Sequence, residues 1–207
     1  MQIAILLYPG FTALDAVGPY EVLGNLPGAE AVFVAEEPGT LRNDSGRLAM
    51  VADASLAEVT RPDIVVVPGA PDTSGPTGSE AVREWLRAVD RTTSWTTSVC
   101  TGSLVLAAAG LLTGRRATSH WLHLEELASY GVESTGERVV TDGKYVTAAG
   151  VSSGLDMGLT LAGRIAGDRT AQALQLLIEY DPQPPYDAGS PEKAPADLVA
   201  EWRAQKL

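Results

Sequence analysis

Short apolar or β-branched segments alternate along the chain with longer segments of helical pattern. A nearly continuous apolar run is typical of a strand that is covered on both faces of a parallel sheet. The predicted strands are residues 2–8, 31–35, 63–67 and 95–99, with a hairpin at 139–147. The predicted helices are residues 11–23, 80–89, 104–109, 122–130, 153–166 and 168–180. This alternation predicts an α/β fold with a doubly wound, mostly parallel sheet flanked by helices.

Glycine, proline and polar residues mark the connections. Residues 43–52 contain an Asn-Asp-Ser-Gly turn and predict a short edge hairpin. Residues 72–78 predict a polar loop, and residues 117–121 predict a short strand that enters the next helix. Residues 181–195 are rich in proline and glycine, so we expect them to be irregular, with a final helix at 196–206.

The change from strand to helix is sharpest at Cys100. The preceding residues suit a buried strand, whereas the Ala/Leu-rich residues 104–109 suit a helix. A strand that enters a helix without a loop makes a sharp elbow, and Gly102 and Ser103 are small enough for the first turn to pass close by. The elbow presents its side chain to the free N–H groups of the helix, which favour a thiolate. The sequence therefore predicts that Cys100 is a nucleophile.

A simpler interpretation of a lone cysteine is a small buried apolar residue without chemistry. The position of Cys100 favours the nucleophile, because doubly wound sheets bind ligands at the carboxyl ends of their strands. Asp15 lies in the connection after the first strand, at the same edge. It is equally compatible with proton transfer and with stabilising a helix N-terminus. Pro19 is expected near the start of that helix, because proline lacks an N–H.

Further candidates for this edge are a glycine and two histidines. Gly69 follows the third central strand and allows backbone N–H groups to approach a ligand, although an ordinary turn glycine explains it as well. His120 and His123 can act as general bases, but such histidines are more often hydrogen-bonded scaffold. The sequence has no glycine motif for a dinucleotide or a phosphate, so we expect no cofactor.

Composition limits the partners. The 207 residues are 45% hydrophobic and suit one domain, 1–207, in which 181–207 form a Pro/Gly-rich extension. The net charge of −11 disfavours nucleic acid and anionic membranes as partners. The apolar runs are too short to span a bilayer and the first residues lack a charged signal start, so we expect a cytoplasmic protein. One cysteine excludes an internal disulfide, and with two histidines it disfavours a metal site.

Three motifs resemble the ThiJ/PfpI superfamily, a branch of the class I glutamine amidotransferase-like fold. They are residues 8–23 (with Tyr-Pro-Gly-Phe and Leu-Asp), residues 66–69 (Val-Val-Pro-Gly) and residues 98–103 (Ser-Val-Cys-Thr-Gly-Ser). The isonitrile hydratases of this superfamily are also similar in residues 117–121 and in the tail at 179–191. The resemblance covers nearly the full chain and implies a flavodoxin-like domain with a small edge hairpin, and a homodimer.

The resemblance also implies an activity. Isonitrile hydratases are carbon–nitrogen hydro-lyases that convert a small-molecule isonitrile to an N-substituted formamide. By resemblance, Cys100 is the nucleophile, Asp15 is the essential acid and Thr101 is the neighbouring hydroxyl. We expect a covalent thioimidate on Cys100, and neither a metal nor a cofactor.

Five more residues are candidates around this centre. Backbone N–H groups of Gly69 or Ala70, together with the elbow at Gly102, are expected to bind substrate or stabilise developing charge. His120 and Glu21 are expected as supporting residues.

Departures from the wider superfamily separate the possible functions. Peptidase-like members have a histidine directly after the cysteine, where this chain has Thr101, so a peptidase is disfavoured. Glyoxalases and deglycases usually have a glutamate where this chain has Asp15. Regulators fuse a similar sensor domain to a helix-turn-helix module, and the residues after Tyr180 do not fit one. A glyoxalase or deglycase, and a free-standing ligand sensor, remain the alternatives.

The expected chemistry sets a condition on the acid. An isonitrile carbon accepts a nucleophile only when the developing negative charge is neutralised, so the site requires a soft nucleophile and a proton donor. Asp15 must then be protonated near neutral pH, which a partly dry pocket and an adjacent thiolate both favour. We expect Asp15 and Cys100 to titrate as a coupled pair.

Overall fold

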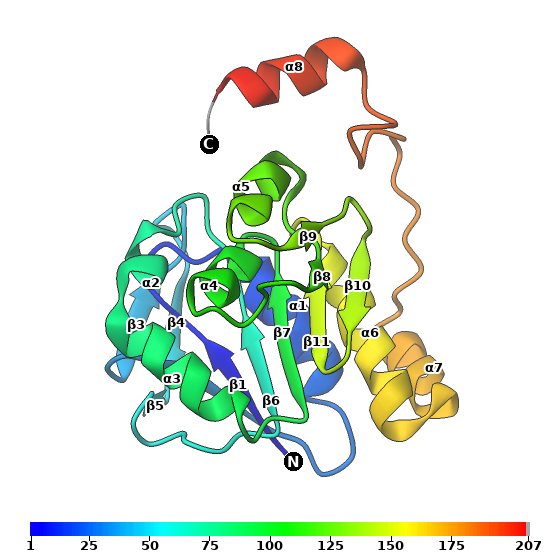
Figure 1. Ribbon diagram of the computed structural model, residues 1–207. Coiled ribbons are helices and arrows are strands. Elements are labelled where there is room, and N and C mark those ends of the chain that lie inside the picture. The colour runs from blue at the N-terminus through cyan, green and yellow to red at the C-terminus, as the bar shows by residue number, and fades with distance from the viewer. Residues whose placement is uncertain (206–207) are drawn as a thin grey trace.

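A central sheet of seven strands lies between two layers of helices in the computed structural model, which describes residues 1–205 (Figure 1). The strands are β1 (Gln2–Leu6), β2 (Glu30–Ala35), β5 (Ala54–Ser55), β6 (Ile64–Val67), β7 (Trp95–Val99), β10 (Val139–Asp142) and β11 (Tyr145–Ala148). Their order is β10-β11-β7-β6-β1-β2-β5, and every neighbouring pair is parallel except β10 and β11. The order β2-β1-β6-β7-β11 is that of a flavodoxin-like doubly wound sheet, which confirms the predicted fold class.

The helices cover both faces of this sheet. Helices α1 (Ala13–Leu23) and α6 (Ser153–Ala166) pack together on one face, and α3 (Glu80–Asp90) and α4 (Gly102–Ala108) cover the other (Figure 1). Glycines in α6 allow its close approach to α1, since a Cβ atom at Gly158 would lie 2.9 Å from the Cβ of Val22. Helix α7 (Asp168–Leu177) follows α6 and packs against it.

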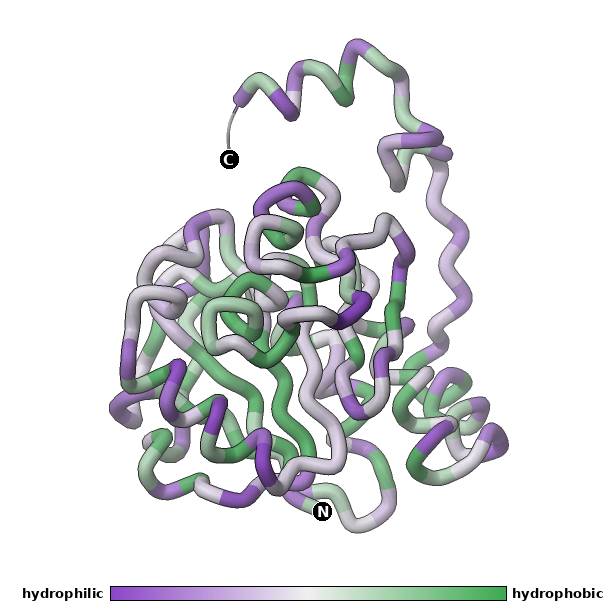
Figure 2. Tube along the Cα trace, viewed as in Figure 1, coloured by the Kyte–Doolittle hydropathy of each residue, from purple (hydrophilic) through white to green (hydrophobic). Residues whose placement is uncertain are grey.

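The core is centred on β1 and β6. Residues 3–6 and 64–67 have no exposed surface, as expected for strands between two helical layers. The same strands form the hydrophobic centre of the molecule in Figure 2. These two strands adjoin each other at the point where the chain changes direction within the sheet, so the connections that follow them meet at its carboxyl edge.

A buried polar cluster ties the opposite, amino-terminal ends of β7 and β11 to α3. The carboxylate of Asp90 accepts hydrogen bonds from the hydroxyl groups of Thr96 at 2.7 Å and Tyr145 at 2.9 Å. Its Oδ1 also lies 3.2 Å from the Nζ of Lys144. Every oxygen of this carboxylate has a partner within the scaffold, so Asp90 has a structural role.

Pro19 differs from the expectation, because it lies in the interior of α1 and not near its start. Proline removes one helical hydrogen bond, the one that would reach the carbonyl of Asp15 four residues earlier. Pro19 is buried, and a Cβ atom at Gly154 of α6 would lie 3.1 Å from its Cδ. Packing against α6 therefore offsets the lost hydrogen bond.

Two predicted connections are also wrong in detail. The expected loop at 72–78 contains a short helix, α2 (Ser74–Gly78). The expected strand at 117–121 is reduced to β8 (Arg116–Ala117), which pairs with β9 (Glu133–Ser134) outside the main sheet. A turn of 3₁₀-helix, η1 (Trp121–His123), then leads into α5 (Leu124–Ser129), so the predicted helix begins later than expected.

Both predicted hairpins are present. Strands β10 and β11 form the antiparallel edge of the main sheet. Strands β3 (Gly39–Arg42) and β4 (Ala49–Ala52) pair antiparallel but form a separate two-stranded sheet, so this hairpin is not part of the main sheet's edge. It packs on the first loop of the chain, where the N–H of Gly10 donates to the carbonyl of Arg42.

The end of the chain forms a long extension. Helix α7 ends at Leu177, three residues before the predicted end of this helix at residue 180. Residues 178–195 contain neither helix nor strand, as expected for residues 181–195. Helix α8 (Ala196–Ala204) lies above α5, beyond the carboxyl edge of the sheet (Figure 1). The predicted end of this helix at Lys206 lies outside the described residues. Within residues 1–205, no helix has the length and apolar character to cross a bilayer.

Candidate active site

The carboxyl edge of the sheet brings Asp15, Gly69 and Cys100 together from three separate connections. Asp15 lies in the first turn of α1, and its Oδ2 accepts a hydrogen bond of 2.9 Å from the N–H of Gly69, which follows β6. A Cβ atom at Gly69 would lie 3.0 Å from the Cβ of Cys100, which follows β7. Asp15 and Gly69 are 54 positions apart in the sequence, and Gly69 and Cys100 are 31 apart. The order of the strands in the sheet makes them neighbours.

Cys100 occupies a sharp strand-to-helix elbow, as predicted. Its φ angle of +59° lies in the left-handed region, which a non-glycine residue adopts only under strain. The carbonyl of Cys100 accepts hydrogen bonds from the hydroxyl groups of Ser103 at 3.2 Å and Ser119 at 3.1 Å. Its N–H donates to the carbonyls of Ala148 and Ala149. These bonds hold the strained backbone in place.

Gly102 allows the elbow to fit against the sheet. A Cβ atom at this position would lie 2.1 Å from the carbonyl oxygen of Val67, which no side chain tolerates. The role that the structure supports for Gly102 is therefore close packing of α4 on β6, in agreement with the small residue expected at the elbow.

The thiol of Cys100 differs from the expectation of a thiolate favoured by the helix N-terminus. Cys100 is only 6% exposed, and burial together with the carboxylate of Asp15 raises its pKa to about 12. Hydrogen bonds from the backbone N–H groups of Thr101 and Val151 lower this pKa but do not outweigh burial. Helix α4 has only seven residues, so its dipole is a small counterweight. At neutral pH the side chain of Cys100 is therefore a thiol, and a reaction through its thiolate would require a partner that removes the proton.

Asp15 has the properties of such a partner. Its side chain is fully buried, and burial raises its pKa to about 7, against the opposing effects of hydrogen bonds with Gly69 and Cys100. Its Oδ1 is buried and has no hydrogen-bond partner among residues 1–205. Asp15 does not cap α1, because its Oδ2 is bonded to Gly69 in another connection. The group is thus poised to gain or lose a proton near neutral pH.

Thr101 and Ala70 form a closed pair of hydrogen bonds. The hydroxyl of Thr101 donates to the carbonyl of Ala70 at 2.6 Å and accepts from its N–H at 2.8 Å. The N–H of Gly69 is bonded to Asp15 in the same way. The two N–H groups expected to stabilise charge on a substrate therefore donate their hydrogen bonds within the protein, to the side chains of Asp15 and Thr101.

Two residues of the site were not identified from the sequence. The hydroxyl of Tyr8, in the connection that follows β1, is buried and donates to the carbonyl of Pro68 at 2.7 Å. Burial and the nearby charges of Asp15 and Cys100 raise the pKa of Tyr8 well above its usual value. Val151 follows β11, and its backbone N–H lowers the pKa of the Cys100 thiol. The signal that could have identified Tyr8 is its place directly before Pro9-Gly10, at the carboxyl end of a buried strand.

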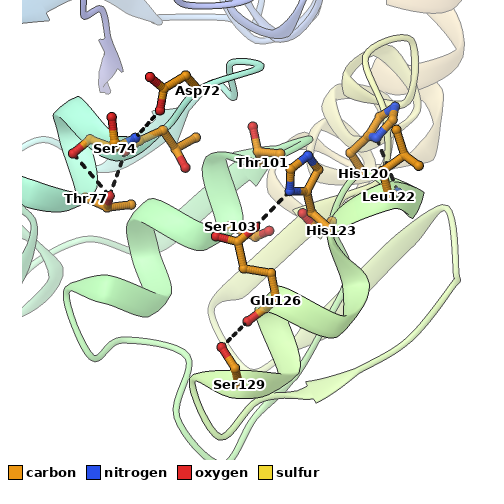
Figure 3. Close-up of polar contacts among 12 residues, drawn as sticks. Asp72, Ser74, Thr77, Thr101, Ser103, His120, Leu122, His123, Glu126 and Ser129 are labelled. Atoms are coloured by element: carbon orange, nitrogen blue, oxygen red, sulfur yellow. Dashed lines mark hydrogen bonds and ion pairs between the residues drawn. The ribbon is translucent and has the colours of Figure 1, made fainter. Parts of the chain in front are cut away.

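The predicted supporting residues lie farther out. The Nδ1 of His120 accepts a weak hydrogen bond from the N–H of Leu122, and the ring of His123 pairs with the carboxylate of Glu126 (Figure 3). Burial, and then the neighbouring His123, lower the pKa of His120, so it is neutral at neutral pH. Glu21 is exposed on α1 and lines a groove with residues of α6 and α7. The geometry supports no role for Glu21 beside Cys100.

A cavity of about 360 Å³ is lined by neighbours of Cys100, although not by Cys100 itself. Among its lining residues, the hydroxyl of Ser119 donates to the carbonyl of Cys100, and the backbone N–H of Val151 lowers the pKa of the Cys100 thiol. The other lining residues come from α1, the η1 turn, the segment at 136–152 and the tail: Leu14, His120, Trp121, Leu124, Gly136, Arg138, Ala149, Gly150, Ser152, Gly189, Ser190, Pro191 and Glu192. In the described part of the chain, no three His, Cys, Asp or Glu side chains are grouped to hold a metal ion.

Known proteins resemble this chain in sequence. An isonitrile hydratase from Pseudomonas putida is 39% identical over 203 residues, which cover 98% of this chain and 89% of that enzyme. The HTH-type transcriptional regulator CdhR from Pseudomonas aeruginosa is 33% identical over 174 residues, which cover 80% of this chain and 51% of the regulator.

Solved structures resemble it in fold. The crystal structure of a ThiJ/PfpI family protein from Pseudomonas syringae has a TM-score of 0.95 and 38% sequence identity, with 99% of this chain and 85% of that chain covered. Drosophila melanogaster DJ-1beta has a TM-score of 0.76 at 22% identity and covers 86% of this chain, which shows a shared fold.

The sequence profile of the DJ-1/PfpI family matches residues 1–163, the part that carries the whole sheet and the three connections around Cys100. The match extends over well more than half of the chain, and it agrees with the motifs from which the superfamily was predicted. The chain belongs to the DJ-1/PfpI family.

Proposed function

We propose that the protein is an isonitrile hydratase, which adds water to an isonitrile and releases an N-substituted formamide. Identity of 39% over nearly the full chain to an isonitrile hydratase supports enzyme activity of this kind. The observation that carries the proposal is the contact of a buried thiol with a buried carboxyl group whose pKa is raised to about 7. This pair supplies the nucleophile and the proton that the reaction requires.

The first step joins the substrate to the protein. In the form of the site in which Cys100 and Asp15 share one proton, the sulfur attacks the terminal carbon of R–N≡C while Asp15 gives its proton to the same carbon. A C–S bond and a C–H bond form, and the product is the thioimidate R–N=CH–S–Cys100. Asp15 is left as a carboxylate. Because the proton passes through Asp15, the high pKa of the isolated thiol does not prevent the attack.

The second step consumes water. The oxygen of a water molecule adds to the thioimidate carbon while the carboxylate of Asp15 accepts a proton from that water. Asp15 then gives this proton to the nitrogen of the substrate. The tetrahedral adduct R–NH–CH(OH)–S–Cys100 collapses with cleavage of the C–S bond. The formamide R–NH–CHO leaves, and the proton of its former hydroxyl group returns to the pair of Cys100 and Asp15. The site ends with the single proton with which it began.

The surroundings suit both steps. The unpartnered Oδ1 of Asp15 is the oxygen that is free for proton transfer among the described residues. The N–H groups of Thr101 and Val151 stabilise negative charge on the sulfur when the C–S bond breaks. The Thr101 hydroxyl is fixed by Ala70, so we assign it a positioning role at the elbow. A homodimer and a cytoplasmic location stay predictions.

The proposal is tested by mass spectrometry. We expect incubation with a simple aliphatic isonitrile to yield the matching formamide, with a transient mass increase on Cys100 that equals one isonitrile. The adduct decays as formamide accumulates, since its carbon is part of the product. Isonitrile recovered unchanged after a long incubation would contradict the proposal.

A ligand sensor is the second candidate, because a transcriptional regulator is 33% identical to 80% of this chain. A sensor binds its ligand and releases it unchanged, so the same mass measurement separates the two functions. Conversion of methylglyoxal to lactate, measured in parallel, would instead favour the glyoxalase alternative.

The pH dependence of kcat/KM tests the state of the pair. Below pH 7 both groups carry a proton, since the pKa of Asp15 is raised to about 7 and that of Cys100 to about 12. The reactive form has lost one of these protons. We therefore expect kcat/KM to rise about tenfold per pH unit below pH 7 and to level off above it. A profile that falls as the pH passes 7 would mean that the fully protonated pair reacts, and would contradict the proposed first step.

A further inference from the structure

The peptide group between Pro68 and Gly69 connects two side chains near the reactive pair. Its carbonyl oxygen, on Pro68, accepts a hydrogen bond of 2.7 Å from the hydroxyl of Tyr8. Its N–H, on Gly69, donates a hydrogen bond of 2.9 Å to the Oδ2 of Asp15. The three groups therefore form one hydrogen-bond chain, in which a single peptide group lies between the tyrosine hydroxyl and the carboxyl group.

The orientation of this peptide group is fixed by its surroundings. It follows β6, and the connection that carries both side chains follows β1, the neighbouring parallel strand (Figure 1). The N–H of Thr12 in that connection donates to the carbonyl of Gly69 at 2.8 Å. A Cβ atom at Gly69 would lie 2.5 Å from the hydroxyl oxygen of Thr101, so the elbow packs directly against the peptide chain here.

The hydrogen-bond chain lies in a dry part of the protein. Asp15 has no exposed surface, Tyr8 is 5% exposed, and both residues of the peptide group are buried. Water therefore does not screen the two hydrogen bonds, and each of them polarises the other. Donation from Tyr8 to the carbonyl draws electrons from the peptide nitrogen, which makes its N–H a stronger donor to Asp15.

Tyr8 remains a donor over the pH range in which Asp15 titrates. Burial, and then the charges of Asp15 and Cys100, raise the pKa of Tyr8 well above its usual value. Its hydroxyl thus keeps its proton near pH 7, where the carboxyl group of Asp15 gains or loses one. A stronger N–H donor stabilises the carboxylate more than the neutral acid, so Tyr8 favours the charged form of Asp15.

Other groups around Asp15 act on the same equilibrium. The titratable groups that face it are Tyr8 in its own connection, Cys100 at the elbow and the exposed Asp44 in the loop between β3 and β4. Burial raises the pKa of Asp15 most, and the charge of Asp44 also raises it. The hydrogen bond from Gly69 is the strongest of the influences that lower this pKa. A change in the strength of that bond therefore changes the proton affinity of Asp15.

We infer that Tyr8 is a positioning residue, whose hydroxyl acts through the Pro68–Gly69 peptide group to orient and strengthen the hydrogen bond that holds Asp15. Tyr8 transfers no proton itself. Its consequence for catalysis rests on the proposed function, in which Asp15 passes a proton to the substrate and accepts one from water. The link between Tyr8 and Asp15 is a property of the folded protein, and it is measured without a substrate.

Tyr8→Phe removes the hydroxyl and keeps the ring. We expect the pKa of Asp15 to rise by about half a unit, since polarisation by a neighbour contributes about 10–30% of the strength of a hydrogen bond. The ¹³C chemical shift of labelled aspartate carboxyl carbons measures this pKa, and Asp15→Asn identifies the signal of Asp15 by its loss. In the hydration assay, the same shift lowers kcat/KM about threefold more at pH 6 than at pH 9.

A stronger donor at position 8 is expected to act in the opposite direction. Replacement of Tyr8 by 3-fluorotyrosine keeps the hydroxyl and makes the phenol more acidic, so the pKa of Asp15 is expected to fall below its wild-type value. This variant also keeps the hydrogen bond to Pro68, and it tests the inference even if Tyr8→Phe fails to fold. A structural role alone predicts no graded change of the Asp15 pKa across the three side chains.

Tyr145→Phe is the matched control. Tyr145 is 7% exposed, and its hydroxyl also donates a buried hydrogen bond, of 2.9 Å to Asp90 at the other end of the sheet. This variant loses the same atom, so a general effect of lost stability would occur in it as well. We expect it to leave the pKa of Asp15 at the wild-type value. An Asp15 pKa that is unchanged in Tyr8→Phe, or raised equally in Tyr145→Phe, would overturn the inference.

Failure of the proposed function gives a different result. If no isonitrile is hydrated but the signal of Asp15 titrates as expected in the variants, the proposed function is wrong and the link between Tyr8 and Asp15 stands. If formamide forms and the titration of Asp15 is the same in the wild type and in Tyr8→Phe, the function stands and the inference is wrong.

Discussion

Replacement of Cys100 by alanine is expected to abolish formamide formation, with a loss of at least about four orders of magnitude in kcat. Without the sulfur no thioimidate forms, and neither the acid nor the cavity replaces that step. The substitution removes one buried atom and keeps the elbow backbone, so the cost in unfolding free energy is about 1 kcal/mol. Formamide production and the melting temperature are measured on the same sample.

Cys100→Ser is the companion variant. It keeps the branching of the side chain, but a hydroxyl is a far weaker nucleophile than a thiol, so we expect a similar loss of turnover. Turnover near the wild-type rate in either variant would show that the reaction does not pass through a bond to Cys100. A large drop in melting temperature would instead assign the cysteine a packing role.

Asp15→Asn is expected to lower kcat by about two to four orders of magnitude. The amide has nearly the shape of the carboxyl group and still accepts the hydrogen bond from Gly69, but it cannot transfer the proton. The rise of kcat/KM with pH near 7 is expected to disappear in this variant. An asparagine variant that is as active as the wild type would leave Asp15 with a structural role only.

The stability of the same variant gives an independent test. The pKa of Asp15 is raised to about 7 in the folded protein and is about 4 in the unfolded chain, so the folded state binds more protons between these pH values. The wild-type protein therefore loses stability as the pH rises from about 4 to about 7. The asparagine variant avoids this cost, and we expect it to be at least as stable as the wild type at pH 8.

Asp90→Asn is the matched control, since Asp90 is also a buried carboxylate but lies at the other end of the sheet. It accepts hydrogen bonds from Thr96 and Tyr145 and pairs with Lys144. Loss of its charge is expected to cost about 1–3 kcal/mol of stability and to leave kcat of the folded protein unchanged. The two variants thus separate a carboxyl group that serves the reaction from one that serves the fold. Equal losses of activity in both would contradict this assignment.

Local sequence patterns predicted most of the architecture. The apolar runs of β1 and β6 are long enough to specify strands buried on both faces, and the β-branched run before Cys100 followed by small residues specifies the elbow. Parallel strands place their carboxyl ends at one edge, so Asp15, Gly69 and Cys100 were expected to be neighbours before any contact was known. The exceptions were segments in which packing decides, such as Pro19 inside α1.

The pKa values and the hydrogen bonds of the candidate site depend on contacts between residues that are distant in the sequence. The pKa of Cys100 is raised by burial and by Asp15, which together outweigh the short helix that was expected to lower it. The N–H groups of Gly69 and Ala70, which were expected to face the substrate, donate hydrogen bonds to Asp15 and Thr101 within the protein. Desolvation and hydrogen-bond partners are properties of the three-dimensional neighbourhood, and one residue's type does not reveal them.

The sequence by itself determined the α/β class, the elbow at Cys100 and the placement of Asp15 at the same edge of the sheet, because these follow from short-range propensity and from the geometry of parallel strands. Only the tertiary structure decided the pKa shifts of Asp15 and Cys100, the placement of Tyr8 and Val151 near them, and the position of the tail. The tail shows the reason most clearly. Its composition predicts only an irregular segment, whereas in the structure residues 188–191 line a cavity together with His120 and Trp121, far away in the chain.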